Sequence, residues 1–528
     1  MDGRSKCRNR WFLGTIIAVW GLLFLSRCAP KANVQAPPPP PTPELSSRAS
    51  EAEALFKKGC YVGFKKAIDI YHELYAQPSI RGKILLPYVK ALILMSVREK
   101  EIGLLNQRYI QWAGDLVSQN PSLRAFAPYV QLSDTMYPKT KGIMRDVNVT
   151  RTVKVVDDIL KNAQIKAEMK ARAQSDDYYA YLYVNFYSNY SNYLEQKEEV
   201  SSFAKLFPDS ILFKYKTATA DYREDPKLLE DLVTAEPDFY EAYYHLGEIA
   251  LGGQKLLEAE KNFLKAYEGI PESPQITIYL GSIYIATEEF DKSLECFEKT
   301  IALAPAYRDA LLGKSMCLSY MGKSNEAIEI LNKLVAMGFY LQGESHYWLA
   351  WNYHELKDND KAQVHIEESK GRLPTDSEVF RLAGTLALEK NELDRAEKEF
   401  TESLHYNGSN IESVFGLAKI YAQKQKWLDS ALFYTHATVA VGQNENALAE
   451  RVRQIRDSTL SEARKAKMLA KKEQQLKVLA ATKATAYYDA AAGYFNAGRK
   501  GQALEMAEKA AAHPQFKEAA EELIKKIK

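Results

Sequence analysis

The chain has 528 residues, with 70 Lys or Arg against 68 Asp or Glu, so its formal net charge is only +2. This balance argues against a nucleic-acid binder with a strongly basic face, and a hydrophobic content of 46% argues against a disordered chain. Gly (26) and Pro (20) are sparse outside the segment 30–43, which favours helices along most of the chain.

The first 28 residues have the layout of a targeting segment. Four basic residues among the first ten precede an uncharged apolar run from Trp11 to Leu25, which is shorter than the ~20 residues of a membrane span. The run ends in Leu25-Ser26-Arg27-Cys28, which resembles the lipobox of bacterial lipoproteins, although that family prefers a small residue where Arg27 stands. The resemblance implies lipidation at Cys28 and an outer-membrane lipoprotein that faces the periplasm. The alternative is an uncleaved anchor in the inner membrane.

Residues 29–45 form a Pro-rich linker that contains five consecutive Pro, from Pro37 to Pro41. Such a run adopts the extended polyproline II conformation, at ~3.1 Å per residue. We therefore expect a stiff spacer between the membrane and the folded body.

Residues 46–239 are expected to form helical hairpins with irregular spacing. One hairpin is indicated around Ala54 to Tyr71, and another from Ile84 to Gln119, where Asn120-Pro121 ends it. The segment 177–193 is rich in Tyr, and Tyr179, Tyr183, Phe186 and Tyr190 recur on one helical face, which predicts a core helix. An exposed aromatic binding surface is the alternative interpretation of this segment.

Residues 240–442 contain six repeating units at a spacing of 34 or 35 residues. Pairs of apolar residues recur in phase, and the second residue of each pair is Gly or Ala. The pairs are Leu246-Gly247, Leu280-Gly281, Leu349-Ala350, Ala383-Gly384 and Leu417-Ala418. Small residues let two helices cross closely, large residues fill the gaps between them, and Pro ends the second helix. The pattern resembles the tetratricopeptide repeat (TPR) family, which implies an all-α fold, an α-solenoid of helix-turn-helix repeats. Residues 46–239 are then expected to be divergent TPR-like units.

After the sixth unit, residues 443–483 carry many charges and neither Gly nor Pro, which predicts one long helix. Two interpretations remain open: an arm that binds a partner, or a solvated, elongated repeat helix. Residues 484–528 match a further TPR unit followed by a charged helix that caps the array.

Motifs for catalysis are missing from the sequence. His72-Glu73 and His354-Glu355 both lack the second His that the H-E-x-x-H zinc motif requires, and no phosphate-binding loop or nucleophile elbow is present. Cys60, Cys296 and Cys317 are an odd number at wide spacing, so we expect small core residues, with one Cys296–Cys317 pair as the alternative. We therefore expect no enzyme, metal site or cofactor, and neither a small-molecule substrate nor nucleic acid as a partner.

The TPR resemblance also implies a binding surface. In TPR arrays the concave face is lined by particular first-helix positions, which hold here Tyr244, Ile278, Leu312, Met316, Tyr320, Tyr347, Trp351, His354, Arg381 and Phe415. The surface is apolar and aromatic near its middle, which suits protein or peptide partners. These side chains could instead pack against neighbouring repeats.

The sequence thus predicts a membrane-tethered, non-enzymatic TPR scaffold that binds protein partners in a bacterial cell envelope. One alternative is a permanent structural subunit of an envelope assembly or secretion complex. Another is an accessory subunit of an envelope enzyme, whose partner supplies the chemistry.

Overall fold

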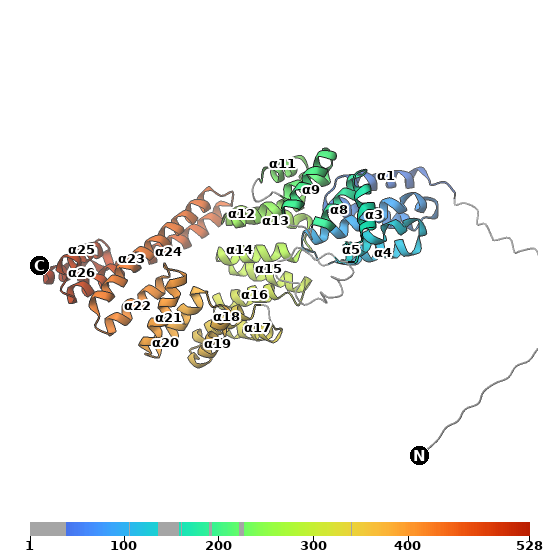
Figure 1. Ribbon diagram of the computed structural model, residues 1–528. Helices are drawn as coiled ribbons and strands as arrows, with labels where there is room; N and C mark the ends of the chain where they lie inside the picture. Colours follow the sequence, from blue (N-terminus) through green and yellow to red (C-terminus); the bar gives the residue numbers. More distant parts are fainter. Residues whose placement is uncertain are drawn as a thin grey trace, which may run out of the picture.

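A computed structural model describes residues 39–104, 106–135, 158–159, 161–188, 193–220, 226–338 and 341–528 of the chain. Every regular element in these ranges is a helix, so the predicted all-α fold is confirmed. Consecutive helices pack side by side in a long curved row rather than around one central core (Figure 1). This arrangement is an α-solenoid, in which each hairpin buries its apolar face against its neighbours.

The N-terminal helices pack around α3, which is the most buried helix of this part. The side chains of α3 from Val89 to Glu101 have exposed fractions of at most 5% except at Lys90. Thr42 caps the first helix by accepting a hydrogen bond from the amide of Leu45 at 3.3 Å. The elements of this part are α1 (Pro43–Lys57), α2 (Tyr61–Tyr75), α3 (Pro78–Glu101), α4 (Arg108–Gln119), the 3-10 helix η1 (Pro121–Phe126) and α5 (Ala127–Thr135).

A second group of helices contains the Tyr-rich segment, which forms α8. Tyr183 and Phe186 are buried as predicted, at 1% exposure each, but Tyr178 and Tyr181 are buried as well. Tyr179, which also lies on the predicted core face, is only partly buried, so α8 is a largely buried core helix. Tyr190 lies outside the described residues. The helices of this group are α7 (Ala163–Ala173), α8 (Asp177–Ser188), α9 (Tyr193–Leu206), α10 (Ile211–Ala220) and α11 (Lys227–Ala235).

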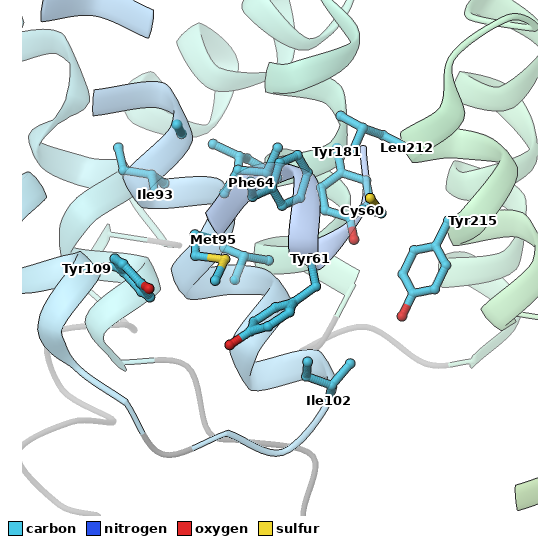
Figure 2. Close-up of a cluster of buried hydrophobic side chains, with 14 of the residues drawn as sticks. Cys60, Tyr61, Phe64, Ile93, Met95, Ile102, Tyr109, Tyr181, Leu212 and Tyr215 are labelled. Atoms are coloured by element: carbon cyan, nitrogen blue, oxygen red, sulfur yellow. The ribbon is translucent and has the colours of Figure 1, made fainter. Parts of the chain in front are cut away.

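A buried ion pair joins the N-terminal helices to the regular repeats. Arg98 of α3 lies 2.9 Å from the carboxylate of Glu241 on α12, and both side chains are wholly buried. The same carboxylate accepts a hydrogen bond from the amide of Tyr61 at 2.5 Å. The Arg98 guanidinium lies over the ring of Tyr215, and the Cζ atom of Arg98 is 3.9 Å from the centre of that ring. Figure 2 shows Tyr61, Phe64, Tyr181 and Tyr215 gathered at this junction.

The regular part begins with five complete hairpins and the first helix of a sixth. The first helices begin at residues 240, 274, 308, 342, 377 and 411, within one residue of the starts expected from the repeat pattern. The helices are α12 (Tyr240–Gly252), α13 (Leu256–Gly269), α14 (Pro274–Ala286), α15 (Phe290–Leu303), α16 (Arg308–Tyr320), α17 (Ser324–Ala336), α18 (Gln342–Glu355), α19 (Asn359–Arg372), α20 (Ser377–Glu389), α21 (Leu393–Tyr406) and α22 (Ile411–Gln423).

Glycine allows the helices of this part to approach closely. A Cβ atom on Gly281 would lie 2.8 Å from the ring of Phe297, and one on Gly313 would lie 2.3 Å from the same ring. Phe297 of α15 is therefore held between α14, the other helix of its own repeat, and α16, the first helix of the next repeat. The small residues that the repeat pattern singles out are thus explained by direct contact with a large residue.

The turn inside each hairpin repeats the same backbone conformation. One residue per turn has a positive φ, between 57° and 73°, at Gln254, Glu288, Gly322, Lys357, Asn391 and Gln425. Gly and Asn adopt this left-handed conformation most easily, so the four other side chains are held in it by the hairpins around them.

The single long helix predicted over residues 443–483 is wrong. The structure has two antiparallel helices there, α23 (Trp427–Asp457) and α24 (Glu462–Asn496), joined by a turn at residues 458–461. Ser458 has an extended backbone and its hydroxyl bonds to the carbonyl of Ile455 at 2.6 Å, which ends α23. Ser458, Thr459 and Ser461 in this turn are residues typical of loops, and they could have indicated that the helix is interrupted here. We call residues 443–483 the arm.

The C-terminal unit is continuous with the arm. The last part of α24 pairs with α25 (Lys500–Ala511), so the first helix of the final hairpin is continuous with the arm. The chain ends with the 3-10 helix η2 (Pro514–Phe516) and α26 (Lys517–Ile527). Figure 1 shows the arm running from this end of the molecule back to α12 and α13, with α14 to α22 curving on one side of it.

Candidate functional site

The first helices of the repeats carry the predicted binding residues, but four of these residues are buried. Tyr244, Ile278, Leu312 and Arg381 have exposed fractions of 9% or less, so they present little surface to a partner. Tyr244 contacts Phe263, Tyr279 and Glu248 within the array. For this residue the alternative interpretation, packing against neighbouring repeats, is therefore correct. The other six are at least partly accessible, and Tyr320 is the most exposed aromatic among them, at 47%.

Aromatic residues form one continuous group around α16 and α18, in which one member, Trp348, is buried at 8% exposure and the others are at least partly accessible. Tyr320 stacks on Phe290, with ring centres 5.3 Å apart, and meets Trp348 edge-on at 5.3 Å. Trp348 in turn lies 5.4 Å from Tyr347 and 6.0 Å from Trp351. We call these five residues the aromatic group.

Sequence reasoning missed two members of this group. Trp348 occupies a first-helix position that is not among the predicted binding positions, and Phe290 is the first residue of a second helix, α15. Phe290 begins α15 directly after the turn at Glu288, which brings it next to the last residue of α16, Tyr320. Its aromatic character was the only signal in the sequence.

Arg381 supports the aromatic group from α20. Its guanidinium lies 5.5 Å from the ring centre of Trp351 and pairs with Glu378 at 2.7 Å and with Glu412. Burial alone would lower the pKa of Arg381, but neighbouring Tyr347 and the two carboxylates raise it, so the cation is retained. Arg381 therefore acts as a fixed positive charge beneath the aromatic rings and contributes little surface of its own.

The remaining predicted residues flank the group. His354 pairs with Glu389 of the next repeat at 3.0 Å, Met316 packs against the buried core of α16 to α18, and Phe415 meets Tyr434 edge-on at 5.8 Å. Burial tends to raise the pKa of Glu389, but the bond from His354 outweighs it and lowers the pKa. These three residues extend a partly apolar surface on both sides of the aromatic group.

Two histidines that the sequence left scattered come together outside this surface. The Nδ1 atoms of His346 and His365 lie 3.0 Å apart, and Tyr353 stacks on His365 with ring centres 5.5 Å apart. Burial, followed by the charge of His365, lowers the pKa of His346, and burial lowers that of His365. Within the described ranges, no group of three or more His, Cys, Asp or Glu is arranged to hold a metal ion.

The three cysteines of the body are all buried and free, so the alternative Cys296–Cys317 disulfide is not formed. The thiol of Cys317 bonds instead to the hydroxyl of Ser293 at 3.0 Å. Burial raises the pKa of Cys60 and of Cys296 to about 11. These thiols are therefore unreactive near neutral pH.

Family models of the tetratricopeptide repeat match residues 227–275 and 280–307. Among curated proteins, the chain is 25% identical over 199 residues to human protein O-mannosyl-transferase TMTC1, which covers 37% of this chain and 22% of the relative. It is 22% identical over 276 residues to human protein O-mannosyl-transferase TMTC3, which covers 45% of this chain and 30% of the relative. The match thus spans less than a third of the length of either relative.

Similar solved structures are shorter than this chain. A tetratricopeptide repeat protein from Parabacteroides merdae has a TM-score of 0.36 and 15% identity, and covers 52% of this chain and 98% of its own. The protein TTC0263 from Thermus thermophilus has a TM-score of 0.30 and 21% identity, and the match covers 34% of this chain and 96% of that protein. MamA from Desulfovibrio magneticus has a TM-score of 0.29 and 16% identity, and the match covers 32% of this chain and 96% of that protein. The family models and the helical hairpins together identify the fold as an α-solenoid of tetratricopeptide repeats.

Proposed function

We propose that this protein is a membrane-tethered, non-enzymatic scaffold of a bacterial cell envelope and that it binds protein partners on the aromatic group. One observation carries the proposal: a large aromatic residue, Tyr320, is 47% exposed and yet held in place by two other rings. TPR arrays generally bind proteins or peptides, and aromatic residues contribute most to such interfaces.

The rigidity of the site explains how it would bind. Tyr320, Tyr347 and Trp351 lie on helices of two adjacent repeats and each touches another aromatic ring. Their rotamers are set before a partner arrives, so little side-chain entropy is lost on binding. A partner with an apolar or aromatic segment, extended or helical, would cover this surface.

Alanine substitutions test the site. Once a partner has been recovered from envelope extracts, Tyr320→Ala and Trp351→Ala should each weaken its binding ~10-fold or more, as expected for an aromatic contact at the centre of an interface. Val364→Ala is the matched control, because Val364 is 63% exposed on the second helix α19. Unchanged binding in both aromatic variants would refute the assignment of the site.

The membrane tether rests on the sequence, because Cys28 and the apolar run before it lie outside the described residues. Within the described ranges, no helix combines the length and the apolar character needed to cross a bilayer. Metabolic labelling with a fatty acid tests the tether directly. Label that is present in the wild type and absent in Cys28→Ala supports lipidation, whereas no label in either favours the uncleaved inner-membrane anchor.

A permanent place in a larger complex is the second candidate. The relatives are named as O-mannosyl-transferases, but the shared part covers less than a third of either, so their activity is not assigned to this chain. Pull-down separates the candidates: a scaffold for transient partners should purify as a single species and bind short peptides. A permanent subunit, of an assembly or of an enzyme, should recover a stoichiometric partner that survives high salt.

A further inference from the structure

The two helices of the arm contact each other along its length. Leu448, Val452, Ile455 and Met468 are buried between its helices, each with an exposed fraction of 8% or less. The helices are also joined by an ion pair between Lys483 and Glu445, at 2.6 Å. These contacts hold the arm together from its root to its tip.

The root of the arm is closely packed against the terminal repeats. A Cβ atom on Gly493 of α24 would lie 3.0 Å from the Cβ of Ala431 on α23, so the two helices cross in direct contact. Ala431, Ala490 and Tyr494 are buried in one hydrophobic cluster at this point. The arm is therefore fixed at its root by apolar packing.

The tip of the arm, in contrast, is attached through long charged side chains. Arg464 donates hydrogen bonds to both oxygens of Glu260 on α13, at 2.9 and 3.0 Å, and it also pairs with Glu289. Glu260 is only 2% exposed, so this pair is largely shielded from water. Burial works against the charged form of Glu289, but Arg464 and Lys292 lower its pKa.

A second polar contact lies two turns further along α24. The Glu288 carboxylate receives Lys471 and Lys472, each at 2.7 Å, and the amide of Gln475 at 2.8 Å. Burial tends to raise the pKa of Glu288, but these donors outweigh it and lower the pKa to about 2. Glu288 is the positive-φ residue of its turn, and from this turn its carboxylate contacts the arm.

Apolar packing does not seal this end of the arm. A cavity of about 1120 Å³ lies between the tip and the first repeats, lined by Val233, Leu257 and Leu264 on one side and Gln454, Thr459 and Leu460 on the other. Ion pairs that are shielded from water are screened little by salt. The tip nevertheless lacks the apolar packing of the root, so removing or reversing one of its charges leaves the attachment without a partner. The arm therefore has a fixed end and a releasable end.

The releasable end adjoins the aromatic group. The ammonium of Lys471 lies 5.5 Å from the ring centre of Phe290, the ring on which Tyr320 stacks. The arm also runs along the same side of α14 to α22 from one end of the curve to the other (Figure 1). When its tip is docked, the arm therefore lies beside Phe290, one ring of the aromatic group.

We infer that the arm is a strap that closes the solenoid in front of the aromatic group, and that release of its tip from Glu260, Glu288 and Glu289 opens the group to bulky partners. This inference rests on the proposed function only in naming the aromatic group as the surface that is covered. The opening itself is a property of the protein alone.

A distance measurement tests the opening without any partner. In the full chain, with Cys7 and Cys28 changed to Ser, labels are placed on Cys introduced at Ala466 and Asp291, which are both exposed. The native thiols at 60, 296 and 317 are buried and do not compete for label. We expect one short distance in the wild-type chain and a second, longer one in Arg464→Glu. Arg456→Glu is the control, because Arg456 pairs with Glu473 within the arm itself, at 3.9 Å.

Access to the aromatic group is measured with maleimides of two sizes on a Tyr320→Cys chain. Carbodiimide coupling of Lys471 or Lys472 to Glu288 locks the strap through an amide bond, and Lys471→Arg with Lys472→Arg gives an identically treated chain that cannot be locked there. Locking should slow labelling by poly(ethylene glycol)-maleimide ~10-fold and leave N-ethylmaleimide unaffected.

Two results would overturn the strap: a distance that Arg464→Glu does not change, or bulky labelling that proceeds equally fast in the locked chain. Neither result concerns the partner, so the proposed function stands or falls separately on Tyr320→Ala and Trp351→Ala. Normal opening combined with undiminished partner binding in both of these variants would instead refute the proposed function and retain the strap.

Discussion

Arg464 and Glu260 form a two-point ion pair, at 2.9 and 3.0 Å, although 204 residues separate them in the chain. The repeats between α13 and α23 each add a similar rotation, so the solenoid curves until its end faces its beginning. The arm then spans the gap. The pair is thus a consequence of the curvature of the whole array, and it also stabilises that curvature.

Removal of the Arg464 guanidinium should destabilise the protein. Arg464→Met leaves the Glu260 carboxylate, which is 2% exposed, without its cationic partner, and we expect a loss of ~2 kcal/mol of unfolding free energy. Urea unfolding measures the change. Arg456→Met, on an arm side chain that is 63% exposed, should change stability by less than ~0.5 kcal/mol. Equal effects of the two substitutions would contradict the shielded pair.

The buried pair at the N-terminal junction should matter more. Arg98→Met leaves Glu241 charged and wholly buried, so we expect a loss of ~3–5 kcal/mol in urea unfolding. Adding Glu241→Gln should recover part of this loss, because the Gln side chain still accepts the bond from the Tyr61 amide without a charge. The exposed Arg124→Met is the control. A double variant less stable than Arg98→Met alone would exclude this explanation.

Two glycine substitutions should have opposite signs. In Gly313→Ala the new Cβ would lie 2.3 Å from the Phe297 ring, so overpacking should cost ~1–3 kcal/mol. In Gly371→Ala the new Cβ meets nothing within 4 Å, and the higher helix propensity of Ala should stabilise α19 by up to ~1 kcal/mol. Thermal unfolding of both variants beside the wild type checks the two signs at once.

The histidine pair predicts a pH dependence. Because the pKa values of His346 and His365 are lowered by folding, the folded protein binds fewer protons than the unfolded chain just below pH 6.5. Stability should therefore be fully present above pH 6.5 and fall as the pH drops through and below that value. His365→Phe keeps a ring on Tyr353 and should reduce this fall, measured as urea midpoints at pH 7.5 and 5.5.

The control for that measurement is the same substitution at an exposed site. His436 is exposed on α23, so His436→Phe should leave the pH dependence of the midpoint as it is in the wild type. If His365→Phe and His436→Phe alter the pH dependence equally, the His346–His365 contact is not its source.

Much of the fold could be predicted because repeat information is local. Pairs such as Leu280-Gly281 recur at fixed spacing, and the first helices begin within one residue of the expected positions. Burial inside α8 was harder, because Tyr178 and Tyr181 lie off the face that periodicity selects and are covered by other helices. A helix that is surrounded on all sides has no amphipathic period for the sequence to display.

The candidate site was predicted only in part for a similar reason. Repeat positions located Tyr320, Tyr347 and Trp351, but the same positions also hold Tyr244 and Arg381, which are buried. Whether a first-helix side chain faces solvent depends on the size of its neighbour in the next repeat, which no single position records. Phe290 joined the aromatic group only through the turn that places α15 against the end of α16.

The sequence by itself determined the helical class, the repeat length and the register of the hairpins, because hydrophobic spacing and small residues act between neighbours in the chain. Only the tertiary structure decided that the arm is a hairpin of two helices and that its tip returns to the first repeats. That contact joins Arg464 to Glu260 and Lys472 to Glu288, across 204 and 184 residues. Its existence depends on the accumulated rotation of the repeats between them, a sum of small packing angles that no local pattern encodes.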